Sequence, residues 1–241
     1  MKKTTVILMV LCLLAAGSAF ADPLPLLDDY FDEIVTPVDE SDPSAGEFVY
    51  SYHYPHADDD AEGGAEINAF YDDLISLSEF ESSFNPGTTT ITYSVTCNND
   101  DYFSVLVHTV RSSEEQSSEH WDGQVFSRKN GSPGQTWTLP RLLGTLAQNE
   151  NDSWLQERQT EKADKLLVDM VWELIEDNEE DIDYFPDFTK EQLSHSFFPE
   201  ENFYLDDTGN PVFYIQPGVA APETAGLLTY SIPLEDILDE L

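Results

Sequence analysis

The sequence feature that most constrains the fold is residues 197–241, in which short apolar runs alternate with turn-forming residues. Aromatic residues dominate the run 203–205 and return at 212–215, and residues of this type pack well in β-strands. Between the two runs lies the segment DDTGN, residues 206–210, whose Gly209 can adopt a positive φ in a turn. The pattern therefore predicts a β-hairpin.

The chain beyond this hairpin predicts one more strand and a closing helix. Proline and glycine residues interrupt residues 217–226, and an apolar run follows at 227–232. Pro233 then precedes the segment LEDILDEL, which predicts a short C-terminal helix. We expect the strands upstream to belong to the same sheet, which the terminal hairpin would complete.

The upstream sequence predicts further strands and two main helices. Aromatic residues alternate along 48–54, and two strand-like runs flank the turn at 98–101. Apolar residues recur with helical spacing near 66–77 and 153–177, which indicates core-facing helices. The expected fold class is α+β: an antiparallel β-sheet built from hairpins and packed against these two helices.

Three smaller features complete the prediction. Residues 124–127 and 136–139 flank glycine-containing turns and predict another hairpin, whereas the preceding polar stretch is typical of a loop. Thr189 and Gln192 have the spacing of a capping box. Cys97 shares the predicted strand face of Ile91, Tyr93 and Val95, and we expect it to be a small buried residue.

The first 21 residues have the pattern of a signal peptide. Lys2 and Lys3 precede an apolar core, and Ala19-Phe20-Ala21 fits a cleavage site. We therefore expect a secreted or periplasmic protein, cleaved after Ala21, with no membrane span in the mature chain. Residues 22–46 are acidic and rich in proline, and they are interpreted as a linker.

The large excess of acidic over basic residues indicates which classes of partner the protein attracts and which it repels. The sequence has 10 Lys+Arg and 48 Asp+Glu, a formal net charge of −38, and removal of Lys2 and Lys3 would make it −38 − 2 = −40. Such a charge repels nucleic acid and anionic lipid and attracts basic proteins and cations. An adaptation for solubility or a salty habitat is the alternative interpretation. The oligomeric state is not predicted.

No motif identifies a catalytic or cofactor-binding class. The sequence lacks G-x-S-x-G, H-E-x-x-H, P-loop and G-x-G-x-x-G patterns. The best candidate for a ligand site is His120 with its neighbours Glu119, Trp121 and Asp122, because a carboxylate can orient an imidazole. A solvated histidine is the alternative. No metal site and no cofactor are predicted, since the acidic segments lack the spacing of an EF-hand loop.

The C-terminal stretch also resembles a known family. The order FYL, Gly, VFY, a Pro-centred turn, Ala-Pro, Gly, an apolar strand and Ile-Pro-Leu is similar to the C-terminal signature of the RsiV-like domain. This domain occurs in RsiV-type anti-sigma factors and beside the catalytic domain of PdaC-type peptidoglycan deacetylases. The central piece of the signature is VAAPETAG here, residues 219–226, with Glu223 where the family commonly has an aromatic residue.

Two upstream segments extend the resemblance. Tyr54-Pro55 and Ile67-Asn68 resemble the N-terminal, PdaC-like half of the same module. Residues 117–120, SSEH, stand where the family commonly has a small-residue run that ends in histidine. The pair of glycines that usually precedes this histidine is absent here.

The resemblance implies a two-part module, with a PdaC-like half at residues 47–110 and an RsiV-like half at residues 111–241. It also implies an extracytoplasmic binding or sensing role. Its ligand would be cell-wall glycan, that is peptidoglycan, or a lysozyme-like basic protein, because RsiV-type sensors recognise lysozyme. The chain has no segment that corresponds to a cytoplasmic anti-sigma region, so we expect a free-standing secreted form. Two alternatives remain: a peptidoglycan hydrolase that uses His120 and nearby carboxylates, and a structural acidic surface protein.

Overall fold

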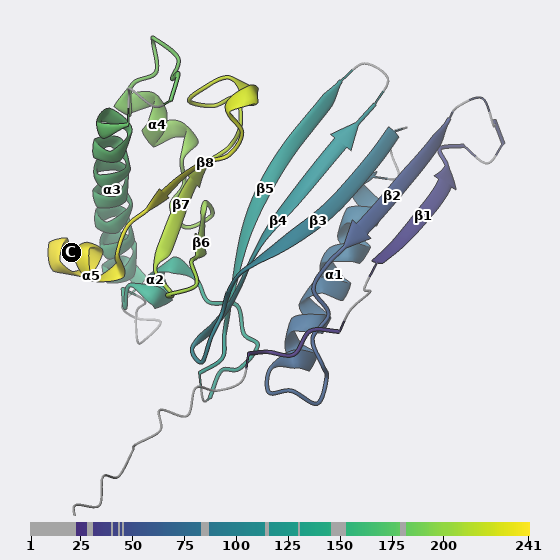
Figure 1. The fold of residues 1–241 in the computed structure, drawn as a ribbon, viewed down its shortest axis with the longest axis horizontal. Helices are drawn as coiled ribbons and strands as arrows, with labels where there is room; N and C mark the ends of the chain where they lie inside the picture. The colour runs from purple at the N-terminus through teal and green to yellow at the C-terminus, as the bar shows by residue number, and fades with distance from the viewer. Residues whose placement is uncertain are drawn as a thin grey trace, which may run out of the picture.

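The structure is a computed structural model that describes residues 23–27, 31–39, 41, 42, 44, 46–82, 87–113, 116–129, 131–145, 153–178 and 182–241. The predicted signal peptide lies outside these residues. The described chain forms eight strands in two sheets, with helices packed on each, and so confirms the α+β class (Figure 1). Side chains are described in the helices except at 77–82 and 153–156.

The N-terminal half is a five-stranded sheet in the order β1-β2-β3-β4-β5. Neighbouring strands are antiparallel except β2 and β3, which run parallel. The prediction of a sheet made only of hairpins was therefore wrong at this pair. A parallel neighbour needs a crossover connection, and helix α1 (Gly64–Ser82) supplies it. The five strands are β1 Phe31–Pro37, β2 Glu47–His53, β3 Gly87–Asn98, β4 Tyr102–Ser112 and β5 Ser117–Ser127.

Part of the segment predicted as a linker belongs to this sheet. Strand β1 pairs with β2 over its full length, from Phe31 opposite His53 to Pro37 opposite Glu47. Ahead of it, the side chain of Leu24 is buried and Leu26 forms a bridge with Ala57. The apolar residues scattered between the prolines thus attach this segment to the body.

An aromatic core fills the space between α1 and one face of the five-stranded sheet. Tyr54 and Tyr71 lie with ring centroids 5.1 Å apart, and Phe70 meets Phe126 edge to face at the same distance of 5.1 Å. The predicted aromatic face of β2 is confirmed, because its members are buried in this core. They are Phe48, Tyr50, Tyr52 and Tyr54.

Asn68 fixes the loop that precedes α1. It is buried, accepts a hydrogen bond from the backbone N–H of Ala57 and donates one to the carbonyl of the same residue, both at 2.9 Å. Its amide also donates to the Asp59 carboxylate at 2.8 Å. The Ile67-Asn68 pair that carried part of the family resemblance therefore has a structural role.

The C-terminal half contains the predicted hairpin, but in a sheet of its own. Strands β6 (Phe203–Leu205), β7 (Pro211–Ile215) and β8 (Leu228–Ser231) form a three-stranded antiparallel sheet. The expectation that they complete the upstream sheet was wrong. The helices of this half are α2 Leu139–Leu142, α3 Ser153–Asp177, α4 Lys190–Ser196 and α5 Leu234–Glu240, with a 3-10 turn η3 at Glu223–Ala225.

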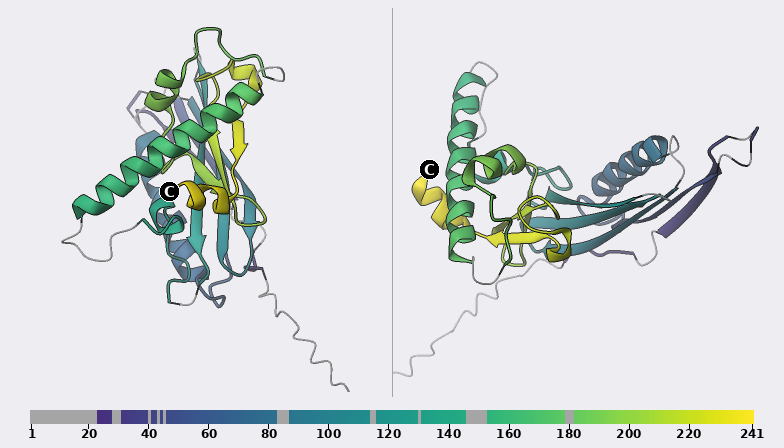
Figure 2. Two further views of the ribbon diagram at one scale, coloured as in Figure 1. Left: turned by 90° about the vertical axis from the view of Figure 1, so that its left-hand side faces the viewer. Right: turned by 90° about the horizontal axis from the view of Figure 1, so that it is seen from above.

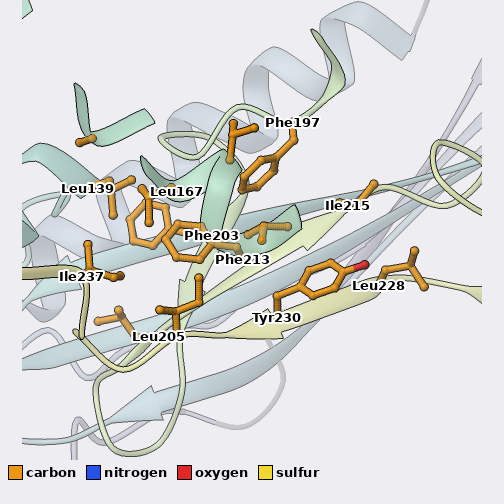
Figure 3. Close-up of a cluster of buried hydrophobic side chains, with 14 of the residues drawn as sticks. Leu139, Leu167, Phe197, Phe203, Leu205, Phe213, Ile215, Leu228, Tyr230 and Ile237 are labelled. Atoms are coloured by element: carbon orange, nitrogen blue, oxygen red, sulfur yellow. The ribbon is translucent and has the colours of Figure 1, made fainter. Parts of the chain in front are cut away.

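A second core lies between this small sheet and its helices (Figure 3). Phe213 is fully buried at its centre, in contact with Phe197 and Phe203. Helix α3 contributes the buried Leu167, and the closing helix α5 contributes Ile237. The predicted capping box at the start of α4 is confirmed, with the Thr189 hydroxyl accepting from the Gln192 backbone N–H.

Strand β5 is longer than its sequence pattern predicted. It includes the polar stretch expected as a loop, and it pairs with β4 along its whole length. Residues 117–120 are exposed, so this end of the strand lacks the apolar alternation that burial would impose. The predicted return strand at 136–139 is reduced to one bridge between Thr136 and Phe126, and Pro140 instead supports the start of α2.

A β-bulge in β3 moves Cys97 to the face of the long sheet that the C-terminal core covers. The register shifts between Val95 and Cys97, which places Cys97 on the face opposite Ile91. Ile91 is buried in the aromatic core, whereas Cys97 is buried in the C-terminal core. The prediction of a buried cysteine is confirmed, but its placement on the face of Ile91 was wrong. Burial raises the pKa of the Cys97 thiol to about 11, and the negative charge of Asp206 is the second largest cause.

The two halves touch where β6 crosses β4 and β5. The Leu205 backbone N–H donates to the buried Ser104 hydroxyl at 3.0 Å. A Cβ at Gly123 would lie 1.9 Å from the carbonyl oxygen of Phe203, so only glycine permits this approach. The rest of the long strands projects beyond the C-terminal half (Figures 1 and 2).

Candidate functional site

The four predicted site residues all lie on β5, but on two faces of the sheet. Cross-strand partners share a face, and β5 pairs with β4 without a register shift. Glu119 and Trp121 lie on the face opposite α1, whereas His120 and Asp122 lie on the face that carries α1. The structure therefore does not bring the four side chains to one site. Their ligand-binding role stays a prediction.

Glu119 and Trp121 instead assemble with a residue that the prediction omitted, His108 of β4. The His108 imidazole stacks on the Trp121 indole, with ring centroids 4.0 Å apart and an angle of 10° between the planes. Its Nε2 lies 3.2 Å from Oε2 of Glu119. One face of the Trp121 ring is thus occupied by His108.

Asp122 and His120 have a different environment on the α1 face. The Gln124 amide donates to Oδ2 of Asp122 at 2.8 Å. Burial raises the pKa of Asp122. The hydrogen bond from Gln124 opposes this increase, and the nearby His120 opposes it to a smaller extent. His120 itself is exposed near the end of the strand. The arrangement places the Asp122 carboxyl group near His120, but this carboxyl group is hydrogen-bonded to Gln124.

The outer edge of β5 is closed by side chains from β7 and the residue after it. Gln216 accepts from the Trp121 backbone N–H at 3.0 Å and donates to its carbonyl at 2.6 Å. The Tyr214 hydroxyl accepts from the Gly123 backbone N–H at 2.9 Å. These bonds replace those of a sixth strand and protect this part of the edge. The sequence placed Tyr214 in the predicted return strand and in the VFY piece of the family signature, but no motif assigned this role to Tyr214 or Gln216.

A cavity among the described residues lies between α3 and α4. It has a volume of about 670 Å³, within the range of ligand sites in proteins. Its apolar wall includes Val168 of α3 and the Phe197-Phe198 pair that follows α4. Phe197 is buried, whereas the Phe198 side chain is 52% exposed.

Acidic residues dominate the polar lining of this cavity. They are Asp164, Asp169, Glu191, Glu200 and Glu201. Burial, and secondly the charge of Glu200, raise the pKa of Asp164 to about 6. Lys190 lies 2.9 Å from Asp169, so this lysine is already paired. Lys165 is the second lysine of the lining.

Local structure explains how these groups meet. Asp164 and Val168 lie one turn apart on the same face of α3, and Asp169 follows Val168. The capping box holds Lys190 and Glu191 in the first turn of α4. The turn after α4 is fixed by the Asn202 side chain, which accepts from the Phe198 backbone N–H at 2.9 Å. The separation of Asp164 from Glu200 along the chain leaves no local motif, and the sequence prediction missed this site.

Two other features are absent from the described residues. No group of three or more His, Cys, Asp or Glu side chains there has an arrangement that would hold a metal ion. No helix in the same part of the chain combines the length and apolar character needed to cross a membrane.

The fold is similar to that of a solved DUF3298 family protein from Pseudomonas aeruginosa PAO1. The two chains are 11% identical, the match covers 90% of this chain and 94% of the other, and the TM-score is 0.53. A second DUF3298 family member, from Bacteroides fragilis NCTC 9343, matches with 15% identity, coverage of 89% and 93%, and a TM-score of 0.43. At these identities the likeness concerns the fold alone.

Similarity to a known sequence family lies in the C-terminal half. No curated protein matches the chain. A family model does match, over residues 155–235, which extend from α3 to the start of α5 and include the hairpin and the α3–α4 cavity. Residues 155–235 therefore match DUF3298, a family described as "Protein of unknown function".

Proposed function

We propose that this protein is an extracytoplasmic binding or sensing module of the RsiV-like type that captures a basic, lysozyme-like muramidase. The observation that carries the proposal is the uncompensated negative charge. If each of the 10 Lys and Arg side chains neutralised one carboxylate, 48 − 10 = 38 Asp and Glu side chains would still lack a basic partner. Basic proteins are the macromolecules that such a surface attracts.

The structure supports a protein ligand over a glycan. Trp121 is the aromatic residue of the predicted site, and His108 covers one face of its ring, which leaves less of the ring for stacking on a sugar. A neutral glycan would also gain little from the negative charge. Peptidoglycan is therefore the second ligand class, supported by the family resemblance.

The hydrolase alternative has less support. It required His120 to act with neighbouring carboxylates, yet Glu119 lies on the opposite face beside His108, and Asp122 is held by Gln124. A purely structural role is consistent with the acidity but leaves the α3–α4 cavity without an explanation.

Calorimetry at two salt concentrations tests the proposal. The mature chain, residues 22–241, is titrated with a lysozyme-like muramidase at about 0.15 M and about 1 M salt, where the Debye lengths are about 8 Å and about 3 Å. A specific interface retains measurable affinity at high salt, because its packed contacts persist when the long-range attraction is screened. The control is an unrelated protein of equal positive charge, which should bind only at low salt.

Two results would refute the proposal. One is complete loss of muramidase binding between the two salt concentrations, which would leave only charge attraction. The other is equal affinity for the control protein.

A further inference from the structure

The α3–α4 cavity has two compartments of different chemistry. Val168 and Phe197 are buried and form an apolar floor, and the half-exposed Phe198 adds an aromatic surface nearer the solvent. Asp164 and Glu200 add carboxylates to the lining, and the charge of Glu200 acts on Asp164. An apolar floor with a carboxylate rim matches a ligand with an apolar stem and a cationic head.

The charge of the lining is not balanced from within. The five acidic residues of the lining face two lysines, which leaves a net charge of −5 + 2 = −3. Lys190 is held by Asp169 at 2.9 Å. A ligand that brings positive charge between Asp164 and Glu200 would remove the repulsion between them, and an anion would increase it.

We infer that this cavity binds the side chain of a lysine or arginine on the basic partner, an inference that rests on the proposed function and names its anchoring site. The methylene stem lies over Phe197 and Phe198, and the ammonium or guanidinium group meets Asp164 and Glu200. Long cationic side chains bury their stems against apolar surface in this way, and an aromatic face adds a cation–π attraction.

Other ligand classes fit the cavity less well. Although five carboxylates line the cavity, no three potential ligands among the described residues have an arrangement that would hold a metal ion. A neutral sugar would leave the carboxylates without a counter-charge, and an acidic ligand would be repelled.

Small probes test the cavity without any partner protein. The mature chain, isotope-labelled, is titrated in NMR with Nα-acetyl-lysine methylamide, the corresponding arginine compound, and the norleucine compound, which has a similar stem and no charge. The lysine or arginine probe should shift the signals of Val168 and Phe198, and the norleucine probe should not. Equal shifts with norleucine would overturn the inference.

Two charge-removing variants locate the head group. Asp164→Asn and Glu200→Gln should each weaken binding of the cationic probe about tenfold, the loss expected when one charged contact disappears. Asp73→Asn is the matched control, because it removes one exposed carboxylate from α1 in the other half of the protein. A loss in Asp73→Asn equal to that in Asp164→Asn would assign the effect to overall charge and overturn the inference.

The same variants separate this inference from the proposed function. Muramidase binding that is unchanged by both Asp164→Asn and Glu200→Gln would overturn the anchoring site and leave the proposed function standing. The opposite result is that the probe binds in an Asp164-dependent way but the wild-type chain does not bind the muramidase. This result would refute the proposed function and support the cavity as a site for cationic side chains.

Discussion

Replacement of Phe213 by alanine should strongly destabilise the C-terminal half. Phe213 is 0% exposed, and its ring centroid lies 6.0 Å from that of Phe197 and 6.4 Å from that of Phe203. Phe213→Ala deletes the ring from the centre of this core and leaves a cavity that packed neighbours fill only in part. Substitutions of this kind cost about 3–5 kcal/mol of unfolding free energy, a large share of the roughly 5–15 kcal/mol of a typical domain.

A urea titration of the mature chain measures this loss. Trp172 packs against Phe188 at the edge of the same core, so tryptophan fluorescence, read together with circular dichroism, reports on its unfolding. The midpoint should fall while the slope of the transition stays the same. Phe31→Ala is the control: this side chain is 61% exposed on β1 and should cost less than about 1 kcal/mol. A loss below about 1 kcal/mol for Phe213→Ala would refute the assignment of Phe213 to the core.

Four further predictions concern other parts of the chain. N-terminal sequencing of the exported protein should begin at Asp22, and a mature form that retains Lys2 would contradict cleavage after Ala21. Gly123→Ala should cost about 1–3 kcal/mol in the urea titration, since its Cβ would meet the Phe203 carbonyl oxygen at 1.9 Å; an unchanged midpoint would refute the close approach. Cys97 should resist a thiol reagent in the native state and react after unfolding, because it is 1% exposed and its thiol pKa is raised to about 11; rapid native labelling would contradict its burial. The raised pKa of Asp164, about 6 against 3.8, means that ionising this group opposes folding as the pH rises between these values. Asp164→Asn should therefore stabilise the protein more at a pH of about 8 than at about 4, and the reverse order would refute the sign.

Local patterns in the sequence predicted the elements well and their assembly less well. The helices α1 and α3, the β3–β4 hairpin and the terminal hairpin follow from spacing and turn residues that act over a few positions. The parallel pairing of β2 with β3 depends on how α1 returns the chain, and the separate C-terminal sheet depends on packing between distant segments. The bulge before Cys97 could not be predicted from the sequence either, because Val95 and Cys97 have the two-residue spacing of an ordinary strand.

The four residues of the predicted site lie on two faces of the sheet because of the period of a β-strand. Successive side chains of a strand point to opposite faces, so Glu119 and His120 lie on opposite faces once residues 117–127 form β5. The error came from interpreting an exposed strand end as a loop, because exposure removes the apolar alternation by which a strand is recognised. Groups that act together on a sheet are neighbours across strands, as His108, Glu119 and Trp121 are. On helices and the turns between them the partners are farther apart still, as Asp164 and Glu200 are. Only the folded chain shows that Asp164 and Glu200 line one cavity.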